Sequence, residues 1–133
     1  MDSRLRGNDD LILYSKMAVR PPKELGADTQ AALTVLRPIC MALPGSAETV
    51  TFGNPTFKAS GKSFAVLDEY KGHACLWLRV DPGRRDELLG LPGWFKSPYD
   101  PRETALCCDL KHVDWTLAEG LATDSHRLAT AKR

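Results

Sequence analysis

The sequence predicts a single α+β domain, a two-layer sandwich in which a five-stranded antiparallel sheet carries its helices on one face. The chain has 133 residues, the usual size of one domain, and 43% of them are hydrophobic. Between residues 48 and 110 the apolar pattern is mainly the alternation of strands, whereas the flanking segments show helical spacing. The connections between the first four strands are so short that neighbouring strands must be antiparallel. The expected order is therefore α-β-β-β-β-α-β-α.

The beginning of the chain differs from the rest. Residues 1–16 mix basic and acidic side chains without a sustained period, and a second methionine stands at Met17. We therefore expect residues 1–16 to be disordered or a spurious extension, with the functional start at Met17. Residues 17–27 contain two adjacent prolines and are expected to form a leader into the single domain of residues 28–133.

The first helix is predicted to begin at Asp28, whose side chain can accept a hydrogen bond from a backbone N–H of the first turn. A stripe of apolar residues at three-to-four spacing continues to Leu43, and Pro44-Gly45 ends it. Gly53-Asn54-Pro55 and Ser60-Gly61 are expected turns between strands. Four strands are predicted in this region, at residues 48–52, 56–59, 62–70 and 73–80.

The second half of the chain continues with a brief helix, which Asp81 is expected to cap and Pro82 to open. Residues 90–101 are rich in Gly and Pro and are expected to form a loop that carries three aromatic residues, Trp94, Phe95 and Tyr99. The fifth strand is predicted at residues 103–110. Asp114 is then expected to cap a closing helix.

The fourth strand predicts that the two faces of the sheet differ. Its alternate residues form an apolar set, Ala74, Leu76, Leu78 and Val80, and a mixed set, His73, Cys75, Trp77 and Arg79. We expect the first set to pack under the helices and the second to meet solvent or a partner. An exposed tryptophan beside an arginine stacks on a base, an aromatic ligand or a partner's side chain. Two arrangements stay open: Trp77 is exposed, or the loop of residues 94–99 covers it.

Basic side chains near this pair are candidates for a binding rim. The candidate residues for binding a nucleic acid or a protein partner are Trp77, Arg79, Lys58, Lys62, Arg84, Arg85 and Lys96. The net charge is only +1, from 18 basic and 17 acidic residues, so binding of a nucleic acid requires a local positive patch. Whether these side chains converge depends on the strand register.

No catalytic or metal-binding pattern accompanies this surface. The glycine-rich phosphate-binding motifs and the GxSxG motif are missing, and the three histidines have no metal-ligand spacing. A dyad of Cys107 and His112 needs a reactive thiolate that nothing nearby supplies. We expect a protein that is not an enzyme and that has no cofactor and no metal. The four cysteines form no CxxC pair and are expected to be reduced, which favours the cytoplasm.

Several segments together carry a resemblance: LPGSAETVTFGNPTFKASGKSFAVL (43–67), LWLRVDP (76–82), SPYD (97–100), VDW (113–115) and SHRLATAKR (125–133). In this order and spacing they resemble the MmcQ/YjbR family of small bacterial proteins. The resemblance implies a fold similar to frataxin-like and secretion-chaperone-like domains. It also implies DNA binding and offers no catalytic residues to carry over. Two positions depart from the pattern: Thr104-Ala105, where many relatives have a tryptophan, and His126, where a tyrosine is common.

Three functions stay open. The leading hypothesis is a small cytoplasmic protein that binds nucleic acid, and DNA in particular, through the open sheet face or its basic rim. The alternative is a protein-interaction or chaperone-like module with an apolar groove near Trp77, Trp94 and Phe95. The third, a small-ligand or metal-responsive protein, is disfavoured because no predicted helix carries an acidic ridge. We expect a monomer or weak homodimer with no membrane association.

Overall fold

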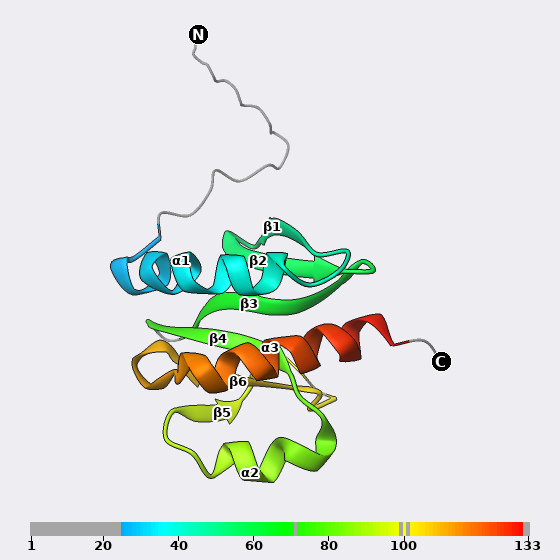
Figure 1. The fold of residues 1–133 in the computed structure, drawn as a ribbon. Coiled ribbons are helices and arrows are strands. Elements are labelled where there is room, and N and C mark those ends of the chain that lie inside the picture. Colours follow the sequence, from blue (N-terminus) through cyan, green and yellow to red (C-terminus); the bar gives the residue numbers. More distant parts are fainter. Residues whose placement is uncertain (1–24, 71, 99, 101, 132–133) are drawn as a thin grey trace, which may run out of the picture.

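The computed structural model describes residues 25–70, 72–98, 100 and 102–131, which form one sheet of six antiparallel strands and three α-helices (Figure 1). The strand order is β1-β2-β3-β4-β6-β5. Helices α1 (Ala27–Met41) and α3 (Trp115–Thr130) lie side by side over one face of the sheet (Figure 1). The two-layer α+β prediction is therefore confirmed, although the predicted number of strands was one too low. The expectations for residues 1–16 fall outside the described residues.

Helix α1 begins without the predicted cap. Its N-cap is Gly26, no side chain caps it, and Asp28 instead lies in the first turn. A carboxylate there still interacts favourably with the positive end of the helix dipole. Arg37 ties the helix to β1 (Ala47–Thr51) through two hydrogen bonds to Glu48, of 2.7 and 2.9 Å. Those bonds hold the pKa of Glu48 below its usual range.

The first hairpin turns one residue earlier than predicted. Thr51 of β1 pairs with Asn54 of β2 (Asn54–Ala59), so the turn consists of Phe52 and Gly53. Both residues have positive φ, 52° and 83°. A two-residue turn with positive φ at both positions matches the right-handed twist of the two strands, which is why it forms here.

The second hairpin agrees with the prediction, since Ser60 and Gly61 connect β2 to β3 (Lys62–Tyr70). A register shift follows, because Phe57 pairs with Ala65 but Lys58 pairs with Ser63. The extra residue in β3 is Phe64, and it is completely buried. β4 (His73–Arg79) pairs with β3 on one side and with β6 (Ala105–Asp109) on the other.

The segment between β4 and β6 contains the strand that the sequence did not predict. Asp81 caps the 3₁₀ turn η1 (Pro82–Arg84), as expected, and α2 (Arg85–Leu89) follows. The three residues of β5 (Trp94–Lys96) then pair with β6, although the sequence predicted a loop here. Beyond β6 a second 3₁₀ turn, η2 (Leu110–His112), leads to α3, and Asp114 caps that helix by accepting hydrogen bonds from Thr116 and Leu117.

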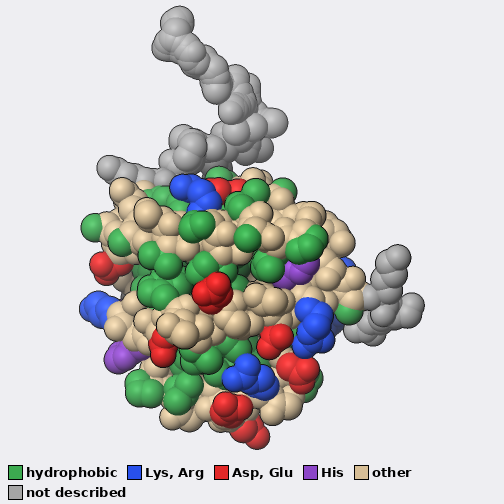
Figure 2. All heavy atoms as spheres, in the orientation of Figure 1, with side chains coloured by type: hydrophobic (Ala, Val, Ile, Leu, Met, Phe, Trp, Pro, Cys, Tyr) green, Lys and Arg blue, Asp and Glu red, His purple; other side chains and the backbone are tan. Residues whose placement is uncertain are grey.

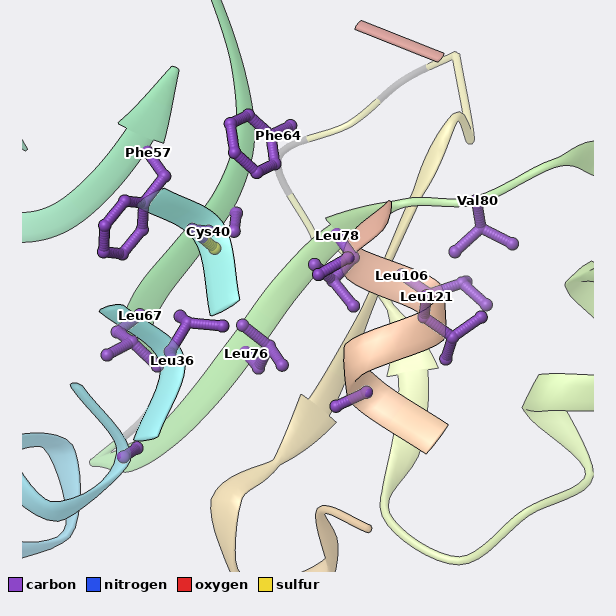
Figure 3. Close-up of a cluster of buried hydrophobic side chains, with 14 of the residues drawn as sticks. Leu36, Cys40, Phe57, Phe64, Leu67, Leu76, Leu78, Val80, Leu106 and Leu121 are labelled. Atoms are coloured by element: carbon purple, nitrogen blue, oxygen red, sulfur yellow. The ribbon is translucent and has the colours of Figure 1, made fainter. Parts of the chain in front are cut away.

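The core lies between the sheet and helices α1 and α3 (Figure 3). Leu36 and Cys40 of α1 and Leu121 of α3 point toward the sheet, where they meet side chains of β2, β3, β4 and β6. Three of the four predicted apolar residues, Leu76, Leu78 and Val80, belong to this core and are at most 5% exposed, whereas Ala74 is only partly buried. The other face of the sheet has neither helix over it.

Candidate functional site

A groove of about 790 Å³ crosses the helix-free face of the sheet. Its middle is formed by Val66 of β3 and Trp77 of β4, which are directly paired across the two strands. Residues of both hairpins complete it: Thr51, Phe52 and Asn54 at one end, Gly61, Lys62 and Ser63 at the other. Two of the four residues on the mixed face of β4, Trp77 and Arg79, therefore line this groove, whereas His73 and Cys75 do not.

The side chains of Trp77 and Arg79 contact each other in the groove. The guanidinium carbon of Arg79 lies 5.7 Å from the Trp77 ring centroid, a cation–π distance. The Nε–H of Arg79 donates to the backbone oxygen of Ser63 at 2.7 Å, which fixes the side chain against β3. Trp77 is half-buried, so its ring is held in place while part of its surface remains accessible from the groove.

Ser125 of α3 positions this pair from the opposite side of the sheet. Its hydroxyl donates to the backbone oxygen of Phe64 and accepts from the backbone N–H of Arg79 at 2.9 Å. Ala65 and Leu78 are the last pair of the β3–β4 ladder at this end, so Phe64 and Arg79 would form the next one. The Ser125 hydroxyl bridges these two residues just beyond the end of the β3–β4 ladder. A helix residue thus fixes the backbone of Arg79.

The two ends of the groove carry opposite charge. Lys62 and Arg79 line one end, and Lys58 joins them on the same face because it pairs with Ser63. Within the described part of the chain, no ion pair joins any of these three cations to a carboxylate. Asp68 lines the other end, on the same face of β3 as Val66. The groove is therefore electrically polar, with Trp77 between its basic and acidic ends.

The other three basic candidates do not join this groove. Arg85 and Lys96 both approach Glu103, at 2.7 and 3.8 Å, and Arg84 approaches Glu87 and Asp124, at 3.6 and 3.8 Å. On the helix-covered side, basic and acidic side chains are interspersed over α2 and the end of α3 (Figure 2). A single positive rim that includes all six predicted basic residues is therefore absent from the described surface.

The helix-free face is not open over its whole width. Tyr70 of β3 and Phe95 of β5 stack with ring centroids 6.3 Å apart, although β4 and β6 lie between their strands. The pair spans the position where Cys75 and Cys107 are buried, so the prediction of solvent or a partner against Cys75 was wrong. Of the predicted covering loop, Phe95 makes this stack while Trp94 packs against the core on the helix side.

Three of the four cysteines, Cys40, Cys75 and Cys108, lack the lowered pKa of a reactive thiol. All four are buried and free. A hydrogen bond with Cys107 and burial raise the pKa of Cys75, and burial raises the pKa of Cys40 to about 12 and that of Cys108 to about 11. Thiols with pKa values this high stay protonated at neutral pH. Among the described residues no group of three or more His, Cys, Asp and Glu side chains is arranged to hold a metal ion.

Comparison with models of known protein families identifies the family of this chain. The model of the family described as YjbR matches residues 41–128, which is more than half of the sequence. The chain belongs to the YjbR family. The resemblance found in the sequence segments is thereby confirmed. The search of curated proteins gave no match.

Solved structures that resemble this YjbR-family chain include two from bacteria. One is the Deinococcus radiodurans protein DR2400, described as a DUF419 domain, which is 30% identical over 73% of this chain and 77% of that one, with a TM-score of 0.62. The other is a Pseudomonas syringae protein that is 14% identical over 79% of this chain and 99% of that one, with a TM-score of 0.59. At 14% identity the likeness concerns the fold only.

No helix in the described part of the chain is long and apolar enough to cross a membrane.

Phe52 is one of several groove residues of this YjbR-family protein that were missed from the sequence. Phe52 was assigned to the end of a strand, but it lies in the hairpin turn with 84% of its surface exposed. The signal was present in Gly53-Asn54, which is compatible with a turn beginning at either residue 52 or residue 53. The turn that starts at residue 52 places Phe52 at the rim of the groove.

Proposed function

We propose that this protein binds single-stranded nucleic acid, with a base stacked on Trp77 and the neighbouring phosphates held by Lys58, Lys62 and Arg79. The observation that carries the proposal is the juxtaposition of an accessible tryptophan with three cations that no described carboxylate neutralises. Aromatic platforms next to basic side chains are the usual means of holding a single strand without reading its sequence.

The shape of the site favours a single strand over a duplex. An antiparallel sheet with one uncovered face offers that face to unstacked bases, and stacking on Trp77 requires a base whose π-face is free. Duplex readers instead place a helix or a two-stranded ribbon in the major groove. Here helices α1 and α3 are packed against the sheet, on the side opposite the groove. DNA and RNA strands share the chemistry that this site recognises.

The small number of positive charges in the groove predicts a modest affinity for nucleic acid. Three cations neutralise at most about three phosphates, and the carboxylate of Asp68 at the other end of the groove repels further ones. For single strands the logarithm of the affinity falls with the logarithm of the salt concentration with a slope of about −0.7 per phosphate contact. We therefore expect a slope of about −2 for this protein.

The double variant Lys58→Gln, Lys62→Gln tests the electrostatic part of the proposal. It removes two of the three phosphate contacts, so the salt slope is expected to fall from about −2 to about −0.7. The measurement is fluorescence anisotropy of labelled oligonucleotides of about ten nucleotides, titrated between about 50 mM and about 200 mM salt. Lys58 is partly exposed, Lys62 is exposed, and neither belongs to the core, so we expect the fold to be retained.

The matched control is Arg84→Gln, which removes a cation that is already close to two carboxylates. It is expected to leave the slope unchanged. A double variant with the wild-type slope, or wild-type protein that binds duplex as tightly as single strands, would contradict the proposal. Absence of salt-sensitive binding to either form of DNA would leave the protein-interaction alternative as the better account of the groove.

A further inference from the structure

Phe52 is the most exposed large hydrophobic side chain of the described residues, at 84%, and it contributes nothing to the core. It lines the same groove as Trp77, at the end that Asn54 and Asp68 also line. Exposed single hydrophobic residues are common, so exposure by itself carries no argument. The backbone at this residue provides a second observation.

The turn that carries Phe52 is one in which phenylalanine is unfavourable. Its φ of 52° lies in the left-handed region, where a Cβ is crowded against the backbone, and Gly53 beside it has a φ of 83°. In two-residue turns of this type Asn, Asp and Gly are preferred at the first position. The chain therefore keeps a large apolar side chain at a strained position where it is not buried. Strained backbone positions of this kind cluster at ligand-binding and active sites, which makes Phe52 a candidate for contact with a ligand.

We infer that Phe52 is a second stacking position of the groove, so that two bases of one strand are held, one on Trp77 and one on Phe52. The inference rests on the proposed function and specifies its ligand as a strand with at least two unstacked bases. Stacking requires no charge and tolerates every base, because each base has a π-face. The acidic end of the groove does not prevent a base from resting on Phe52.

Charge also orients the strand between the two rings. Asp68 is fixed at the Phe52 end by a hydrogen bond from Asn54 Nδ2 at 3.0 Å, so its carboxylate keeps phosphates away from that end. The phosphates then lie toward Lys58, Lys62 and Arg79, where the positive charge is. The two aromatic rings and the three cations thus engage different parts of the same strand.

The variant Phe52→Asn tests the stacking role of Phe52 without destabilising the fold. Asn is favoured in this turn, so the melting temperature is expected to rise by about 3 °C. Loss of one stacked base is expected to weaken binding of a single-stranded oligonucleotide by about tenfold or more. Phe52→Tyr keeps the aromatic ring and is expected to bind like the wild type. Val50→Asn, at a residue of β1 that is 58% exposed, is the matched control and is expected to leave the affinity unchanged.

The outcomes distinguish this inference from the proposed function. Weaker binding by Phe52→Asn together with wild-type binding by Phe52→Tyr supports the second stacking position. Unchanged binding by Phe52→Asn in a protein that loses binding on Trp77→Ala overturns the inference and leaves the proposed function standing. A lower melting temperature for Phe52→Asn would contradict the strain argument. Failure of the wild type to bind single strands overturns both.

Discussion

Replacing Ser125 with alanine is expected to lower the free energy of unfolding by about 2–4 kcal/mol, because it leaves two buried backbone groups without a partner. Ser125 is completely buried, and its hydroxyl is bonded to the oxygen of Phe64 and to the N–H of Arg79. A methyl group offers neither a donor nor an acceptor, and the β3–β4 ladder ends at Ala65 and Leu78, one pair before these two groups. Denaturant unfolding measures the change.

Thr123→Ala is the matched control for Ser125→Ala. Thr123 is an exposed residue of the same helix, and its hydroxyl bonds only to the oxygen of Glu119, one turn earlier. Its removal is expected to change stability by less than about 0.5 kcal/mol. If Ser125→Ala were as mild as Thr123→Ala, the bridge between β3 and β4 would not have the role assigned to it. Arg79 would then be positioned by its bond to Ser63 alone.

Replacing Trp77 with alanine is expected to reduce the affinity for a single-stranded oligonucleotide by about tenfold or more, because stacking of a base on an aromatic ring contributes about 1–3 kcal/mol. The change also removes the ring beneath the Arg79 guanidinium, so that cation becomes less well placed for a phosphate. Trp77→Phe retains an aromatic face and is expected to recover most of the affinity. Anisotropy titration at low salt measures all three proteins.

The control for Trp77→Ala is Leu91→Ala, which removes an apolar side chain that is 40% exposed and lies between α2 and β5 rather than in the groove. It is expected to bind like the wild type. Thermal unfolding of both variants establishes that each is folded at the temperature of the titration. A folded Trp77→Ala protein with wild-type affinity would remove Trp77 from the binding surface and contradict the proposal.

The fold could largely be predicted from the sequence, because its elements are specified locally. The alternation in β4 indicated which side chains enter the core, and Asp81 and Asp114 indicated two helix starts. β5 could not be predicted, since three residues in a Gly- and Pro-rich segment become a strand only by pairing with β6. The burial of Cys75 was also not predictable, because the Tyr70–Phe95 stack forms across two intervening strands.

The candidate site could be predicted in part. Trp77 and Arg79 were found because they alternate along one strand, a property of local sequence. The division of the basic residues into a groove set and a carboxylate-paired set depends on register and on distant partners such as Glu103, which no local pattern reveals. Phe52 was missed because a shift of one residue in the turn changes a strand residue into an exposed one.

The most direct test of the account uses the three tryptophans of the chain as internal reporters. Trp77 lines the groove, whereas Trp94 and Trp115 pack against the core between the sheet and the helices. Titration of ¹⁵N-labelled protein with a single-stranded oligonucleotide is expected to shift the indole N–H signal of Trp77 and to leave those of Trp94 and Trp115 in place. Shifts confined to Trp94 or Trp115, or no shift at Trp77 in a bound complex, would contradict the claim that the helix-free face of the sheet is the binding surface.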